Sequence, residues 1–183
     1  MHHERRGQEG TDVDIMAVRF PFRTELALSN KPMVDHDVFN RGGKIDLIIA
    51  EVKLGLCNLN GPWTNPERGN MRRVLYAIGA FNRNQIHQIA RTLYENQYFE
   101  DDQYRFRLFT VGKTKNEELS NAVVQLTWDD ILRFIHERFT AYKYYKAQHR
   151  QWDRTGQTLF RLVDQYHDKQ DEFVETIIQT LQA

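Results

Sequence analysis

Runs of branched apolar residues alternate along the chain with stretches of helical periodicity. The strongest run reads Ile45 to Val52, and its consecutive apolar centre is typical of a central strand buried on both faces. A shorter β-rich segment precedes it and ends at Pro21. Two later segments are shorter, and the first of them alternates apolar and polar side chains at period two. The strands predicted from these patterns cover residues 13–20, 44–54, 104–111 and 122–126.

Apolar residues at helical spacing predict helices between and after these strands. Thr127 is expected to be the N-cap of one helix, because Asp130 stands at the position that completes a capping box. The last amphipathic stretch begins after Gly156 and reaches the C-terminal end. The helices expected from this spacing cover about residues 71–81, 85–95, 128–146 and 157–181.

The order of these elements predicts an α/β fold: a mixed central sheet flanked by helices, with extra C-terminal helices. No repeat and no Pro/Gly/Ser-rich linker divides the chain, so we expect a single domain over residues 1–183. Its core would span about 11–127, and a C-terminal helical extension about 128–183. Residues 22–43 lack a sustained period and predict a long excursion between the first two strands, of the kind that often has a function.

Composition narrows the function classes. Lys+Arg and Asp+Glu both number 25, so no field of the whole molecule directs it toward nucleic acid or membrane, and any polyanion site must be local. The single cysteine, Cys57, excludes an intramolecular disulfide framework and a cysteine-based zinc cluster, and predicts a reducing, cytoplasmic location. The longest apolar run is too short to span a bilayer, so no membrane association is expected.

The candidate chemistry lies at the end of the central strand. Glu51 and Lys53 are expected to project from the same face because side chains alternate along a strand, and the Val52 carbonyl between them is available as a further oxygen ligand. Metal-dependent phosphodiester hydrolysis needs carboxylates that hold Mg²⁺ and a positive group that orients water. Asp14, in the first strand, comes near Glu51 if the two strands pair as an antiparallel hairpin.

These residues resemble the PD-(D/E)XK nuclease superfamily, which has the restriction-endonuclease-like fold. The resemblance rests on residues 12–18 and 45–53, because an acidic residue opens one strand and Glu-x-Lys lies on the next. It implies that Asp14 and Glu51 are metal ligands and that Lys53 positions or activates the attacking water. It also implies a metal-dependent endonuclease that hydrolyses DNA phosphodiester bonds with Mg²⁺, or with Mn²⁺ as an alternative.

Departures from the family pattern leave alternatives open. Val13 stands where the name-giving proline would be. Relatives usually place a helix and a strand before the acidic strand, whereas residues 1–11 are polar here, so a homodimer or a partner chain is an open expectation. The separation of Asp14 from Glu51 is long for such a hairpin, which makes Asp46 a competing candidate for the acidic role. The alternative to an enzyme is a catalytically silent, nuclease-like subunit that binds nucleic acid or is structural.

Basic side chains form two clusters that could contact DNA phosphates. One flanks the start of the helix expected at 71–81. The other lies in residues 131–154, where six basic and two acidic side chains interleave with aromatic residues that could stack on unpaired bases. Alternatively, the acidic last helix neutralises this second cluster in an antiparallel helical hairpin. The candidate DNA-binding residues are Arg68, Arg72, Arg73, Arg138, Lys143, Lys146 and Arg150.

Overall fold

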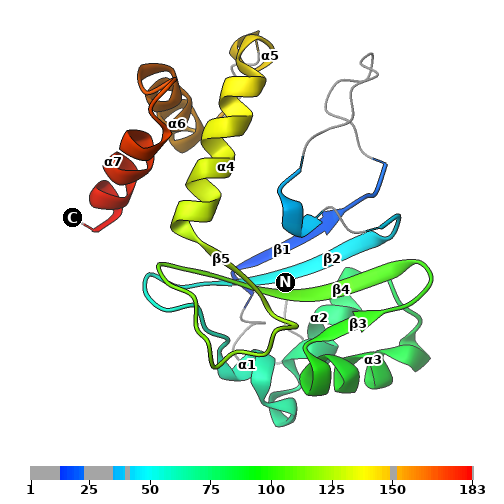
Figure 1. The fold of residues 1–183 in the computed structure, drawn as a ribbon. Helices are drawn as coiled ribbons and strands as arrows, with labels where there is room; N and C mark the ends of the chain where they lie inside the picture. Colours follow the sequence, from blue (N-terminus) through cyan, green and yellow to red (C-terminus); the bar gives the residue numbers. More distant parts are fainter. Residues whose placement is uncertain (1–12, 23–34, 40–41, 149–151, 183) are drawn as a thin grey trace. The chain divides into compact units, whose positions relative to one another are not determined.

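The fold is given by a computed structural model that describes residues 13–22, 35–39, 42–148 and 152–182 (Figure 1). Most of the expected loop 22–43 and the candidate Arg150 lie outside the described residues. The strands are β1 (Ile15–Arg19), β2 (Ile45–Val52), β3 (Tyr98–Glu100), β4 (Tyr104–Gly112) and β5 (Val124–Thr127). The helices are α1 (Gly61–Thr64), α2 (Asn70–Ile78), α3 (Arg83–Asn96), α4 (Trp128–Ala141), α5 (Lys143–Gln148), α6 (Arg154–Gln165) and α7 (Gln170–Gln182). Two 3-10 turns add η1 (Asp37–Phe39) and η2 (Pro66–Arg68).

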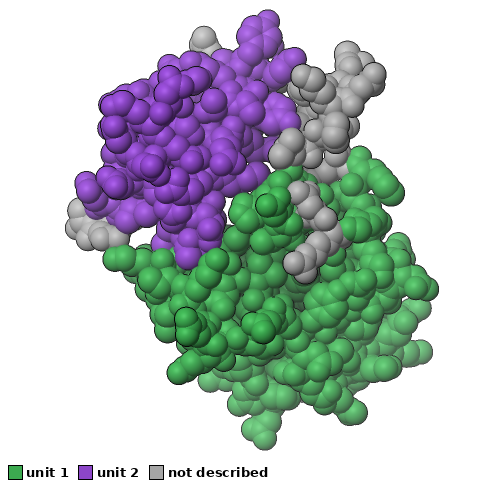
Figure 2. Space-filling view, viewed as in Figure 1, with its two compact units in different colours: residues 1–126 green, residues 127–183 purple. Residues whose placement is uncertain are grey.

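The chain divides into two compact units, residues 1–126 and 127–183, which Figure 2 colours separately. The expectation of one domain over the whole chain stays a prediction, and each unit is described by itself. Among the described residues, no helix combines the length and the apolar character needed to cross a membrane.

The first unit contains a mixed sheet with strand order β1-β2-β4-β3, in which β5 also pairs with β4. β1 is antiparallel to β2, β2 is parallel to β4, and β3 is antiparallel to β4. The predicted α/β class and mixed sheet are therefore confirmed. β1 stands at the end of this order, and its apolar side chains Ile15, Met16 and Val18 are exposed.

The central strand β2 is buried on both faces, as its apolar run predicts. Leu47 and Ile49 belong to the core that α2 and α3 cover, and Ile48 belongs to a smaller cluster on the opposite face. Figure 1 shows these two helices against one side of the sheet. Because side chains alternate along a strand, Glu51 points to the face covered by the helices, whereas Asp46 points to the other.

Several elements differ from the sequence predictions. β3 was not expected, because three residues are too few to show a period; it follows Gln97, which ends α3 with a left-handed φ of 57°. The helix expected to reach residue 146 breaks at Tyr142, whose backbone leaves the helical region at φ −111° and ψ 18°. The last expected helix is two helices, α6 and α7, joined by a turn at residues 166–169.

The second unit packs α4, α6 and α7 around an apolar cluster of its own, which includes Leu132, Val163 and Phe173. The capping box expected at the start of α4 is confirmed, since the Thr127 hydroxyl accepts from the Asp130 N–H at 3.1 Å and the carboxylate accepts from the Thr127 N–H at 2.9 Å. This reciprocal pair satisfies backbone donors that the first turn of a helix otherwise leaves without partners.

Candidate active site

Asp14 lies directly before β1, beside the end of β2. The register pairs Ile15 with Ala50, so continuing the antiparallel ladder by one residue brings Asp14 opposite Glu51. Asp14 Oδ2 accepts a hydrogen bond from the Val52 N–H at 2.7 Å. The Val52 carbonyl lies on the same side of β2 as that N–H, because both groups of one residue point the same way in a strand. The acidic segment and the Glu-x-Lys segment therefore lie side by side.

Glu51 is a buried carboxylate, 2% exposed, at the end of the central strand. Its Oε2 accepts from the Trp63 indole N–H at 2.8 Å. Its Oε1 accepts from Lys53 Nζ at 2.5 Å and from the Asn60 side-chain amide. A buried charge is stable only when it has such partners. The three donors, one next to β2 and two from the segment that follows it, fix the orientation of this carboxylate.

Two of these donors, Asn60 and Trp63, lie in the crossover that follows β2. The short helix α1 begins at Gly61 with Pro62 in its first turn, and its Trp63 is fully buried. The preceding loop is tied to β4, since Thr110 Oγ1 accepts from the Asn58 N–H and donates to the Asn58 carbonyl, both at 3.0 Å. Sequence reasoning missed Asn60 and Trp63. The one signal in the sequence is that a buried tryptophan usually needs a partner for its N–H, and this signal does not say which acceptor the fold brings to it.

Lys53 connects the buried carboxylate to the surface. Its backbone N–H continues the β2–β4 ladder by donating to the Val111 carbonyl at 2.8 Å. Its side chain is 24% exposed, while that of its ion-pair partner Glu51 is 2% exposed. The ammonium therefore lies between a fixed negative charge and solvent, where it can also contact a bound molecule.

The competing acid, Asp46, is not brought together with Glu51. It is fully buried on the opposite face of β2, where Arg105 binds it with Nε at 2.6 Å and Nη2 at 2.9 Å. Arg107 Nη2 lies 3.1 Å from the same carboxylate. The hydrogen bonds to Asp46 raise the pKa of Arg105 above its usual value, against the lowering effect of burial. Asp46 is thus the centre of a buried ion-pair network.

The three arginines near α2 differ in their surroundings. Arg68 is exposed and lies against α1, since a Cβ on Gly61 would be 3.2 Å from Arg68 Cζ. It is therefore close to the helix that carries the indole bound to the buried carboxylate. Arg72 is exposed beside Gly69, which has a left-handed φ of 62° and separates η2 from α2. Arg73 is half-buried.

The described basic candidates of the second unit, Arg138, Lys143 and Lys146, have partners within that unit. Lys143 forms an ion pair with Asp164 of α6, which is the kind of neutralisation that the alternative interpretation expects. Arg138 Cζ and Lys146 Nζ lie over aromatic rings, with centroids at 5.2 Å and 5.5 Å respectively. These contacts organise the surface of the unit, and a role in DNA binding stays a prediction.

No three His, Cys, Asp or Glu side chains within the described ranges group so that they could hold a metal ion. The set around Asp14 consists instead of two carboxylates and one backbone carbonyl. Comparison of the chain with protein-family models, curated proteins and solved structures finds no match. Function is therefore inferred from the arrangement of these residues.

Proposed function

We propose that this chain is a metal-dependent endonuclease of the restriction-endonuclease-like PD-(D/E)XK type, which hydrolyses DNA phosphodiester bonds in the cytoplasm. The observation that carries the proposal is the 2.7 Å hydrogen bond from the Val52 N–H to Asp14, together with the register that faces Asp14 with Glu51. An acid directly before β1 thus lies next to the Glu-x-Lys at the end of β2, an arrangement that suits metal-dependent phosphodiester hydrolysis.

The donor atoms suit Mg²⁺ or Mn²⁺, which prefer oxygen ligands. Asp14 is exposed, and the Val52 carbonyl points to the same side of β2 as the N–H that donates to Asp14. Among the described residues, hydrogen bonds occupy both acceptor positions of Glu51 Oε1 and one of Oε2, so one carboxylate position is left for a cation. The cation would supply positive charge that polarises a phosphate oxygen and lowers the pKa of a bound water.

The chain's own side chains hold the reactants. Hydrolysis bonds the water oxygen to phosphorus and breaks one P–O ester bond; one proton of the water goes to the departing alcohol oxygen and the other stays with the new phosphate hydroxyl. Lys53, held next to Glu51 and partly exposed, donates a hydrogen bond that orients the water or the phosphate. Arg68 offers a planar guanidinium to a neighbouring phosphate.

One observation favours the alternative, a nuclease-like module that binds nucleic acid without cutting. The three donors to Glu51 are side chains of this protein. A buried carboxylate with a purely structural role has its hydrogen bonds satisfied in the same way. The exposed edge strand β1 supports the further expectation of a second copy or a partner chain.

Nicking of supercoiled plasmid DNA with Mg²⁺, Mn²⁺ or EDTA separates the two functions. Asp14→Asn keeps an acceptor for the Val52 N–H but removes the charge, and Lys53→Ala removes the ammonium. Each should slow nicking about 100-fold or more, because several kcal/mol of transition-state stabilisation are lost. The matched variants Glu67→Gln and Lys113→Ala change exposed residues and should nick at the native rate.

DNA binding in EDTA should persist in all four variants. A native chain that binds DNA but nicks it with neither metal would establish the alternative. Native rates in Asp14→Asn and Lys53→Ala would remove the proposed residues from the reaction.

A further inference from the structure

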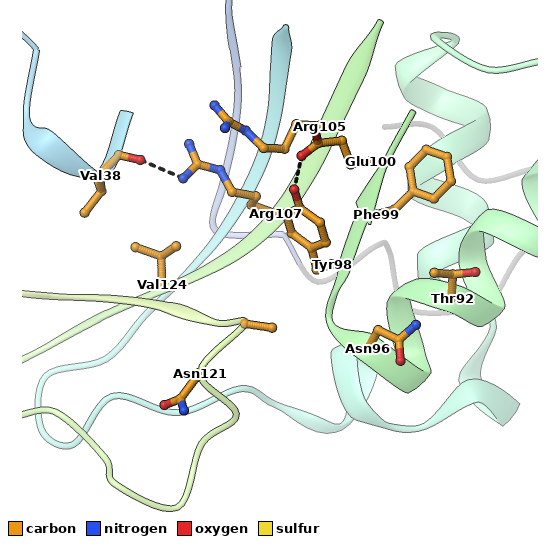
Figure 3. A pocket seen from close by; sticks show the side chains of 11 residues that line it. Val38, Thr92, Asn96, Tyr98, Phe99, Glu100, Arg105, Arg107, Asn121 and Val124 are labelled. Carbon is orange, nitrogen blue, oxygen red and sulfur yellow. Dashed lines mark hydrogen bonds between the residues drawn. The ribbon is translucent and has the colours of Figure 1, made fainter. Parts of the chain in front are cut away.

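A second candidate site lies beside β3, at the edge of the sheet, and Arg105 and Arg107 line it from the face opposite the one to which Glu51 points. A pocket of about 870 Å³ opens there between β3, β4, the end of α3 and the loop before β5. Its volume is in the range of about 300–1,000 Å³ that is usual for small-molecule sites. Figure 3 shows its wall, with Arg107 between Val38 and Tyr98. We call this space the β3 pocket.

Two buried guanidinium groups line the β3 pocket. Arg105 is 6% exposed and Arg107 is 4% exposed, so their charges are weakly screened by solvent. Arg105 donates hydrogen bonds from Nε and Nη2 to the Asp46 carboxylate, whereas its Nη1 makes no hydrogen bond to the described residues. A guanidinium has five N–H donors in a fixed fork, so this remaining nitrogen can bind an anion.

The second guanidinium is held in place rather than mobile. Arg107 Nη1 donates to the Val38 carbonyl at 2.7 Å. Its Cζ lies 5.0 Å from the ring centroid of Phe109 and 5.7 Å from that of Phe39. A cation fixed by rings and a carbonyl needs little reordering when a ligand binds, which favours affinity.

The acid on the pocket wall is neutralised by its neighbours. The Glu100 carboxylate accepts from Lys44 Nζ at 2.6 Å and from the Tyr98 hydroxyl. These hydrogen bonds, that of Lys44 foremost, lower the pKa of Glu100 below its usual value. Because Lys44 balances this carboxylate, the wall does not repel an anion that approaches Arg105.

The other lining residues suit a flat heterocyclic ligand that has polar edges. Val124 and Ala122 present apolar surface, and Tyr98 is half-buried beside them. Asn96 and Asn121 are exposed at the rim, where their amides can both donate and accept hydrogen bonds. The lining thus combines an anion donor, apolar walls and amides that can read the edge of a heterocycle.

We propose that the β3 pocket binds a nucleoside monophosphate, with the phosphate at Arg105 and the base against the apolar wall near Val124. The site is separate from the proposed cutting site, because Arg105 and Glu51 point to opposite faces of the sheet.

Isothermal titration calorimetry in EDTA tests this proposal with three probes: AMP, adenosine and inorganic phosphate. Saturable 1:1 binding of AMP is expected. Adenosine lacks the anion that Arg105 would bind and phosphate lacks the base that the apolar wall would contact, so each should bind at least about 10-fold more weakly than AMP. Phosphate binding as tightly as AMP would refute a nucleotide site, and absence of AMP binding would overturn the proposal.

A steric variant locates the binding. Ala122→Trp fills the β3 pocket and should weaken AMP at least about 10-fold, whereas Ala77→Trp, at an exposed position of α2, should not. Should Ala122→Trp fail to fold by circular dichroism, Asn121→Trp at the exposed rim replaces it. Native affinity in the folded blocking variant would overturn the assignment. Glu51→Gln should keep native AMP affinity, so a loss of affinity there would contradict a separate site, whatever its effect on nicking.

Discussion

Neutralising Asp46 is the sharpest test of how the first unit is held together. Asp46 is fully buried, and its carboxylate accepts two hydrogen bonds from Arg105 and lies 3.1 Å from Arg107. Asp46→Asn keeps the shape of the side chain but leaves two buried guanidinium groups without their shared negative charge. Removal of one partner from a buried ion pair costs about 3–5 kcal/mol, far more than the loss of an exposed pair.

Urea unfolding followed by circular dichroism measures this cost. With a slope of about 2 kcal/mol per molar urea, the midpoint should fall by roughly 1.5–2.5 M. The thermal midpoint should fall by about 6–20 °C, since 1 kcal/mol corresponds to about 2–4 °C in a chain of this size. Asp102→Asn changes an exposed acid and should stay within about 0.5 kcal/mol of the native chain. A loss below about 1 kcal/mol in Asp46→Asn would refute the network as described.

Three further predictions concern other contacts. Trp63→Phe removes the N–H donor to Glu51 Oε2 and should destabilise the first unit by about 1–3 kcal/mol in the same urea experiment, because a buried carboxylate loses a partner. Thr127→Ala removes the N-cap of α4 and should cost about 1 kcal/mol, most of which Thr127→Ser should restore. The carboxyl NMR titration of Glu100 should have its midpoint below 4.5, and Lys44→Met should raise it. Because the folded-state pKa of Glu100 is lowered, its contribution to stability is present above the unfolded-state pKa and is lost as pH falls through the folded value.

The pattern of apolar residues was sufficient to predict the long strands of the sheet. β2 was predictable because burial on both faces demands a continuous apolar run, and the start of α4 because its capping box is local in sequence. β3 was not predictable, since its three residues form a strand only by pairing with β4. The break at Tyr142 was also missed, because the apolar spacing continues through it.

The candidate site was predictable in part. Alternation already implies that Asp46 and Glu51, five residues apart, point to opposite faces of one strand, so the competition between them could have been decided from the sequence. The donors Asn60 and Trp63 could not have been predicted, because a crossover loop and the short helix α1 bring them to Glu51. Arg105 and Arg107 looked like ordinary members of an alternating strand, although they are buried beside a pocket.

The central claim is that Asp14 and Glu51 hold one divalent cation between them. Electron paramagnetic resonance of free Mn²⁺, titrated with the purified chain, measures this without DNA or turnover. The account predicts one saturable Mn²⁺ site that Mg²⁺ competes for, with affinity at least about 10-fold lower in folded Asp14→Asn and Glu51→Gln and unchanged in Glu67→Gln. Equal Mn²⁺ affinity in the native chain and all three variants would contradict it.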